Sequence, residues 1–293
     1  MSGVAGRWLE VRARYADVLT DPDGDPGDLA DALIEVGGRA VEERDGWLVT
    51  HLPEPPDPDS FIATLEPRLG AALGAPVSVA WSWCAAEDWA ETWKRGLAPR
   101  RLTPRLWVTP SWAPAPAEAG DLVIVVDPGM AFGTAEHGTT RGVIRLLDRA
   151  LVPGERVLDI GSGSAILAVA AALLGASTVT AVEGDPVASE YARENIERNG
   201  VGDRVRWIQA LADSPMVRAL GMADGVVANI ESGVLRRLLP GFRDVLAPGR
   251  WMILSGIPAE EWELFSREVV DSGFALVATD ADGEWRAGWF TRS

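Results

Sequence analysis

The first third of the chain alternates between strand-like and helix-like patterns of hydrophobic residues. The segment RWLEVRARY has the period of two that a half-buried strand shows, with Trp8, Val11 and Ala13 as candidate buried residues. Helical patterns follow at residues 28–37 (DLADALIEVG) and at residues 61–74 (FIATLEPRLGAALG). This region is therefore expected to fold as one small unit that contains both strands and helices.

Three further strand-like runs complete this unit. Two of them flank Asp45-Gly46, a dipeptide typical of a hairpin turn, and the third is VSVAWSW at residues 77–83. The run PEPPDPDS at residues 53–60 is expected to break the chain before the second helix. The resulting order, β-α-β-β-α-β, predicts a ferredoxin-like sandwich.

The pattern changes between residues 85 and 119. The segment AEDWAETWKRGL places Trp89 and Trp93 one helical turn apart and so on one face. RLWVTPSW resembles a strand, and PAPAEAG is a connector rich in proline and alanine. We expect most of the 13 tryptophans of the chain to pack in cores or between domains.

From Asp121 onward, apolar strands and amphipathic helices alternate up to the C-terminus. Strands are expected at LVIVVD, RVLDIG, TVTAVE, RVRWIQA, GVVANI and RWMILSGI. The last segment, FALVATDADGEWRAGWFT, contains the turn residues Asp282-Gly283 and is expected to form a hairpin that makes the final strand antiparallel. Such alternation predicts an α/β fold with a mostly parallel sheet covered on both faces.

Composition narrows the possible partners. With 293 residues the chain can form two domains, and 47% hydrophobic with 24% charged residues is ordinary for a globular protein. The net charge of −16 argues against nucleic acid or an anionic membrane surface as a direct partner, because phosphate contacts need clustered Lys and Arg. It leaves room for a basic protein partner.

The cysteine and the two histidines bear on disulfide bonds and metal binding. Cys84 is the only cysteine, so no intrachain disulfide can form. His51 and His137 have no metal-ligand spacing around them, and we expect no metal site. No run approaches membrane-spanning length and no signal peptide is evident, so a cytoplasmic location is expected.

The stretch VLDIGSGSAIL, residues 157–167, is the strongest functional signal. An apolar strand leads into Asp159 and then into a turn with Gly161 and Gly163, where the backbone can approach a ligand closely. About twenty residues on, the next strand ends in Glu183, which is placed to hydrogen-bond ribose hydroxyls. Together these features indicate a nucleoside cofactor, the alternative being glycines that serve packing alone.

Asp159 helps to decide between two kinds of nucleoside. A dinucleotide places its pyrophosphate at the helix N-terminus, and an acid directly before the turn would repel that anion. An acid suits the amino group and sulfonium of S-adenosylmethionine instead. A further loop, DPGMAFGTAEHGTTR, precedes this strand, and its Thr139 or Thr140 can cap the following helix, contact a cofactor, or do both.

The segments DPGMAFGTAEHGTT, VLDIGSGSAILAVAAALLGA, AVEGDP, ENIERNGV and VVANIESGVL resemble, in order and spacing, the methyltransferases of ribosomal protein L11, the PrmA family. The resemblance runs from RWLEV near the start to EWRAGWFTR at the end. It implies a ferredoxin-like substrate-recognition domain (1–84), a connecting helix and linker (85–119), and a class I methyltransferase domain (120–293). The last of these would have a Rossmann-like seven-stranded sheet with an antiparallel final strand.

The resemblance also implies site residues. Carried over position by position, the cofactor contacts are Thr140, Gly161, Glu183 and Asn229. The turn itself adds two more candidate cofactor-binding residues, Asp159 and Gly163. The candidate catalytic residues are Asn229, whose amide oxygen can orient an acceptor amine, and His137, which can relay a proton or order its loop.

The expected function is S-adenosylmethionine-dependent N-methylation of lysine and N-terminal amines of ribosomal protein L11. Alternatives are another protein's lysines or a small amine as acceptor, a nicotinamide-dependent oxidoreductase, and a cofactor-binding module without catalysis. The chain departs from the family's usual residues at four positions that flank the expected substrate entrance: Ala135, Glu136, Glu231 and Ser232. The sequence leaves the oligomeric state open.

Overall fold

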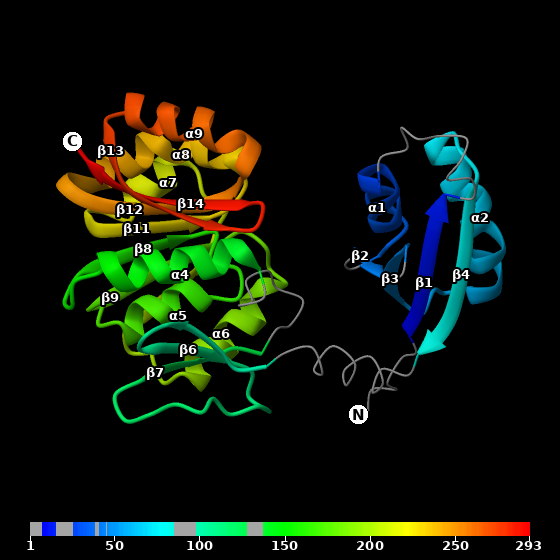
Figure 1. The fold of residues 1–293 in the computed structure, drawn as a ribbon, viewed down its shortest axis with the longest axis horizontal. Coiled ribbons are helices and arrows are strands. Elements are labelled where there is room, and N and C mark those ends of the chain that lie inside the picture. The colour runs from blue at the N-terminus through cyan, green and yellow to red at the C-terminus, as the bar shows by residue number, and fades with distance from the viewer. Residues whose placement is uncertain (1–7, 16–25, 39–40, 45, 85–97, 128–136) are drawn as a thin grey trace. The chain divides into compact units, whose positions relative to one another are not determined.

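The computed structural model describes residues 8–15, 26–38, 41–44, 46–84, 98–127 and 137–293. The chain divides into two compact units, residues 1–96 and 97–293 (Figure 1). Trp89 and Trp93, the hairpin residue Asp45, and the departures at Ala135 and Glu136 lie outside the described residues.

The first unit is an antiparallel sheet with two helices. Its strands have the order β2-β3-β1-β4. They are β1 (Trp8–Tyr15), β2 (Val41–Arg44), β3 (Trp47–Pro53) and β4 (Val77–Cys84), and the helices are α1 (Pro26–Glu35) and α2 (Pro58–Leu73). Leucines of both helices are buried together with β1 residues in one core. The element order and strand order confirm the predicted ferredoxin-like sandwich.

Two details of the prediction for this unit were wrong. Leu9, Val11 and Ala13 are fully buried, whereas Trp8 is partly exposed, because residues that alternate along a strand face opposite sides and Trp8 is out of phase with the core. Helix α2 begins at Pro58, inside the run expected to break the chain. Asp57 caps it by accepting the Ser60 N–H at 3.1 Å, and a proline in the first turn needs no hydrogen-bonded N–H.

Residues 98–119, placed in the connecting segment by the sequence, belong to the second unit. They contribute β5 (Arg100–Thr103) and β6 (Leu106–Thr109), and β6 pairs in parallel with β7 (Leu122–Val125) to give a separate three-stranded sheet. β7 was expected among the strands of the large sheet, and this was wrong. Its residue Ile124 is fully buried with residues of α4 and α5, so the small sheet extends the core of this unit.

The large sheet has seven strands in the order β10-β9-β8-β11-β12-β14-β13. They are β8 (Arg156–Ile160), β9 (Thr178–Glu183), β10 (Val205–Gln209), β11 (Ala223–Asn229), β12 (Leu246–Pro258), β13 (Phe274–Asp282) and β14 (Trp285–Arg292). β14 inserts between β12 and β13 and is antiparallel to both. This confirms the predicted class of sheet with an antiparallel last strand.

Helices cover both faces of this sheet (Figure 1). One face holds α4 (Gly138–Ala150), α5 (Ile166–Leu173) and α6 (Ala188–Arg198), and the other holds α7 (Ser214–Ala219), α8 (Ser232–Val245) and α9 (Ala259–Asp271). From β8 the chain proceeds outward to β9 and β10, and from β11 it proceeds the opposite way to β12. A crevice is expected where these directions diverge, beyond the carboxyl ends of β8 and β11.

Candidate active site

A cavity of about 470 Å³ lies beyond the carboxyl ends of the central strands; we call it the cleft. Its lining residues are His137, Thr139, Gly161, Gly163, Glu183, Asn229, Ile230, Glu231, Ser232, Gly256, Pro258, Glu261 and Trp285. The lining therefore includes five predicted site residues, namely His137, Gly161, Gly163, Glu183 and Asn229. The other two, Thr140 and Asp159, are fully buried and do not line the cleft.

The cleft crosses five neighbouring strands. Its β9 end consists of Gly161, Gly163 and Glu183, and its β14 end consists of Glu231, Ser232, Pro258, Glu261 and Trp285. Asn229 lies between the two ends, because β11 is the third of these five strands. Since adjacent strands are about 4.8 Å apart, the five strands span roughly 19 Å, enough for a nucleoside and a second group side by side.

The β9 end is formed by a glycine turn and a carboxylate. Gly161 and Gly163 have φ values of +72° and +51°, a conformation that L side chains rarely adopt. The Gly161 N–H donates to Val182 O at 2.9 Å and ties the turn to β9. Glu183 is held by two backbone donors, Gly163 N–H at 2.9 Å to Oε2 and Asp185 N–H at 2.9 Å to Oε1. Each carboxylate oxygen keeps a further lone pair for a ligand hydroxyl.

Asn229 is oriented by a short hydrogen-bond chain. Its Nδ2 donates to Thr139 Oγ1 at 3.1 Å and lies 3.4 Å from Thr140 Oγ1, and Thr139 Oγ1 is 2.7 Å from His137 Nδ1. Burial lowers the pKa of His137, with a further contribution from Arg141, which favours a neutral ring. A neutral Nδ1 can accept the single hydroxyl proton of Thr139, while Thr139 accepts the amide proton.

These hydrogen bonds do not involve the amide oxygen of Asn229. The residue is 8% exposed, and its Oδ1 is buried without a hydrogen-bond partner among the described residues. A buried amide oxygen without a partner costs free energy, and a ligand that donates a hydrogen bond to it recovers that free energy. The middle of the cleft is thus prepared for a neutral or cationic donor group.

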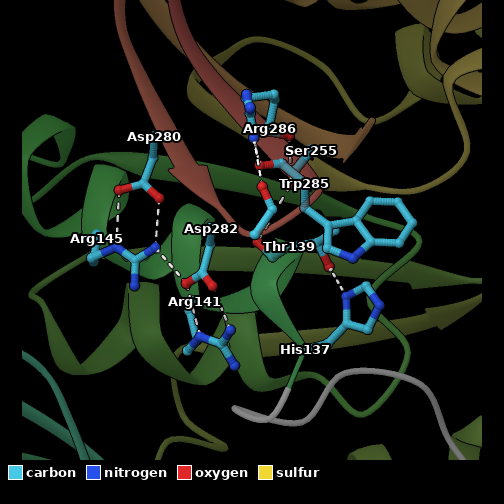
Figure 2. Close-up of polar contacts among 10 residues, drawn as sticks. His137, Thr139, Arg141, Arg145, Ser255, Asp280, Asp282, Trp285 and Arg286 are labelled. Carbon is cyan, nitrogen blue, oxygen red and sulfur yellow. Dashed lines mark hydrogen bonds and ion pairs between the residues drawn. The ribbon is translucent and has the colours of Figure 1, made fainter. Parts of the chain in front are cut away.

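The wall at the β14 end is fixed by a cluster of arginines and aspartates (Figure 2). Arg141 makes two hydrogen bonds to Asp282, at 2.8 and 2.5 Å, and Arg145 makes two to Asp280, at 2.9 and 2.5 Å. A further contact of 2.9 Å joins Arg145 to Asp282. These arginines hold the pKa of the Asp282 carboxyl well below its usual range, with Arg141 contributing most. Helix α4 is thereby clamped to the β13–β14 hairpin.

The clamped hairpin presents Trp285 to the start of α4. The ring centroids of His137 and Trp285 are 4.9 Å apart, and both side chains line the cleft (Figure 2). Gly142 allows α4 to approach β14 closely, because a Cβ at this position would lie 3.2 Å from Ala287 Cβ. His137 is the residue that precedes α4 and makes no side-chain cap, while Thr139 and Thr140 lie within the first turn. The expectation that one of these threonines caps the helix was therefore wrong.

Asp159 occupies an apolar environment at the end of β8. It is fully buried, and neither carboxylate oxygen makes a hydrogen bond of good geometry with a described residue. Burial raises the pKa of Asp159 to about 8, and the charge of Glu183 adds to the rise. The Ala168 N–H offsets this only in part. Asp159 is not among the lining residues of the cleft, and its contact with a cofactor amino group stays a prediction.

Sequence reasoning missed several lining residues. Trp285 had been assigned only to a hairpin, and Glu261 and Gly256 to a helix and a strand. Glu231 and Ser232, noted only as departures from the family, line the cleft two and three residues after Asn229. Their position after a strand end was a usable signal, whereas the place of Trp285 depends on how the last hairpin inserts into the sheet.

The described part of the chain has neither a metal-ligand group nor a membrane-spanning helix. It contains no group of three or more His, Cys, Asp or Glu side chains arranged to hold a metal ion. None of its helices is long and apolar enough to cross a bilayer.

Comparison with known proteins agrees with this architecture. Residues 41–292 match the family model described as ribosomal protein L11 methyltransferase (PrmA). A protein of that name from Pelotomaculum thermopropionicum is 42% identical, with 96% of this chain and 97% of the relative covered. One from Symbiobacterium thermophilum is 41% identical, with 96% and 98% covered.

A solved structure supports the same assignment. The ribosomal protein L11 methylase of Lactobacillus delbrueckii subsp. bulgaricus superposes with a TM-score of 0.60 at 29% identity, covering 67% of this chain and 99% of that chain. The family match, the identity over nearly the whole length and the seven-stranded sheet all agree. The chain belongs to the ribosomal protein L11 methyltransferase (PrmA) family.

Proposed function

We propose that this enzyme transfers methyl groups from S-adenosylmethionine to lysine and N-terminal amines of ribosomal protein L11. Family membership supports the reaction class, since its relatives carry that name over nearly their full length. The observation that carries the proposal within this chain is Asn229, a residue that lines the cleft and whose buried amide oxygen has no hydrogen-bond partner among the described residues.

The β9 end fits the nucleoside part of this cofactor. Gly161 and Gly163 allow the ligand to approach the backbone, and Glu183 retains lone pairs for the two ribose hydroxyls. When bound, the cofactor supplies an activated methyl group on a sulfonium. The cleft lining includes Glu183, Glu231 and Glu261 but, among the described residues, neither Lys nor Arg, and this suits a cofactor that carries positive charge.

The middle of the cleft fits the acceptor amine. A lysine ammonium has a pKa near ~10.4 and must lose a proton before its nitrogen can act as a nucleophile. The Asn229 oxygen would accept an N–H of the amine and direct its lone pair, while Thr139 and His137 hold the amide in that orientation. Because the amide is neutral, it does not favour the unreactive ammonium as a carboxylate would.

The remaining assignments follow from this reaction. We assign substrate recognition to the N-terminal unit, because all described residues that line the cleft belong to the second unit. The lack of lysine and arginine among the described lining residues argues against nucleic acid as the acceptor. Because the proposed acceptor is a ribosomal protein, we also place the enzyme in the cytoplasm.

The direct test is methylation of purified ribosomal protein L11 by the full-length enzyme with S-adenosylmethionine. We expect a mass increase in L11, located to lysine and N-terminal amines by peptide mass spectrometry. A parallel reaction with a cell lysate and tritiated cofactor compares L11 with every other protein and with small amines. Cofactor binding without label in L11, or stronger label in another molecule, would overturn the assignment of the acceptor.

A further inference from the structure

The two ends of the cleft differ in what they can bind. If the proposed function holds, on which this inference rests, the ribose lies at the β9 end near Glu183 and the acceptor enters from elsewhere. Asn229 ends β11, and beyond it in the strand order only β12 and β14 line the cleft. The acceptor therefore approaches through the β14 end.

The β14 end carries two carboxylates. Glu231 is exposed, immediately precedes α8, and has no arginine within ion-pair distance in the described part of the chain. Glu261 accepts a hydrogen bond of 2.5 Å from Ser232 Oγ and lies 3.7 Å from Arg236. Ser232 follows Glu231 directly in the sequence, so Glu261 is hydrogen-bonded by the residue next to Glu231.

Arg236 does not cancel this negative charge. It sits one helical turn after Ser232, and its Nε is bound at 2.7 Å to Glu268. Arg236 is not among the residues that line the cleft, whereas both Glu231 and Glu261 are. The acceptor side of the cleft thus presents net negative charge to whatever enters it.

A second observation points to a ligand at the same place. The Asn229 side chain, two residues before Glu231, is more than nine-tenths buried, lines the cleft, and has an amide oxygen without a described partner. An unpartnered acceptor in a cleft that two carboxylates also line is matched by one chemical class, a group with several N–H donors and a positive charge.

We propose that Glu231 and Glu261 form a cation-binding subsite that selects a protonated primary amine as the acceptor and delivers it to Asn229. The carboxylates attract and orient the ammonium at the solvent-exposed entrance. The ammonium releases its proton to water there, and the neutral amide then holds the amine. Glu231 contributes more to the attraction of the ammonium than Glu261, because Glu261 already accepts a hydrogen bond from Ser232 and lies within ion-pair distance of Arg236. Acceptors that carry phosphate are repelled by the same charges.

The test compares three variants of the full-length enzyme, each of which removes one negative charge: Glu231→Gln, Glu261→Gln and the control Glu263→Gln. Glu263 is on the same helix as Glu261, is 88% exposed and does not line the cleft. The probe is purified ribosomal protein L11, and the readouts are kcat/KM for L11, the Kd of S-adenosylmethionine and the melting temperature.

We expect kcat/KM for L11 to fall about tenfold in Glu231→Gln and about threefold in Glu261→Gln, through KM and more strongly at low salt. The control should match the wild type, and the cofactor Kd should stay within about twofold in all three variants.

Unchanged kcat/KM in both cleft variants, with an active wild type, would overturn the subsite while the proposed function stands. A wild type that binds the cofactor but methylates no amine would overturn the proposed function itself. A loss of cofactor affinity equal to the loss of kcat/KM would show that the carboxylates serve the cofactor, and would also overturn the subsite.

Discussion

The two ends of the cleft are built in different ways. At the β9 end, two strands that follow each other in sequence supply a backbone turn and one carboxylate, and 20 residues separate Gly163 from Glu183. At the β14 end, side chains come from the start of α8, the end of β12, the start of α9 and the start of β14. The β9 end depends on local backbone geometry, whereas the β14 end depends on long-range packing. On the proposed assignment of the two ends, substrate specificity can change at the β14 end without loss of the cofactor site.

Asn229, between the two ends, should show the largest effect. Asn229→Ala removes the oxygen that orients the amine, and we expect kcat to fall about 100- to 1000-fold at every pH, by analogy with loss of one positioned donor or acceptor. Asn229→Asp should lose turnover near neutral pH and recover part of it as the pH rises, because a carboxylate favours the ammonium. The check is single-turnover methylation across a pH series. Wild-type turnover in both variants would reduce Asn229 to a strand-terminating residue.

Glu183 should show the next largest effect, confined to the cofactor. Glu183→Ala removes charge-assisted hydrogen bonds to ribose, and we expect a loss of about 1.5–3 kcal/mol in S-adenosylmethionine binding, measured by calorimetry. Glu183→Gln should lose less, since it keeps one acceptor oxygen. If Glu183→Ala binds the cofactor as the wild type does, the ribose is not held at the β9 end.

The arginine–aspartate cluster predicts a mixed effect at the β14 end. Asp282→Asn weakens the clamp on the hairpin, and we expect a loss of about 1–3 kcal/mol in the free energy of unfolding together with a lower kcat/KM for L11. The cofactor Kd should stay unchanged, because Trp285 and not the glycine turn is displaced. Asp271→Asn, at the exposed end of α9, is the matched control.

The pH dependence of this clamp has a definite sign. The pKa of Asp282 is lower in the folded protein than its ordinary value, so its contribution to stability is complete above the ordinary value. That contribution is lost as the pH falls through the lowered pKa. Chemical unfolding of the wild type and of Asp282→Asn should therefore converge in acid. A difference in stability that persists unchanged in acid would contradict the ionic origin of the clamp.

Asp159 should give the stability a pH dependence of the opposite sign to that of the clamp. Burial raises its pKa to about 8 from the ordinary value of 3.8, so between these values the folded state keeps a proton that the unfolded chain has released. Stability should fall as the pH rises through this interval. Asp159→Asn removes the ionisable group, and we expect it to be more stable than the wild type near pH 8, with a flatter pH profile. Denaturant unfolding at a series of pH values tests this.

The same difference between the two ends explains what could be predicted from the sequence. Gly161 and Glu183 were found because a strand, a turn and the next strand carry their signal within one local segment. Trp285 and Asp282 were not, because only the insertion of β14 between β12 and β13 brings them to α4. The i,i+4 spacing of Arg141 and Arg145 marks one side of the clamp but does not identify its partners.

The same limit applied to the fold. From residue 121 onward, hydrophobic patterning predicted the order of strands and helices except for the short helix α7. In the same unit, β5 was not expected either. The sheet to which β7 belongs could not be predicted, because a short apolar strand such as LVIV pairs equally well in either sheet until its neighbours are known. In the same way the alternating pattern of this segment suggested Trp8 as a buried residue, although the phase of β1 places Leu9 in the core.

The independence of the two ends is tested most directly by a double-mutant cycle between Glu183→Ala and Glu231→Gln, read as kcat/KM at subsaturating cofactor and L11. If the β9 end binds the nucleoside and the β14 end selects the acceptor, the two losses in transition-state free energy should add within about 0.5 kcal/mol. A coupling energy above about 1 kcal/mol would place both carboxylates on one ligand and contradict the division of the cleft.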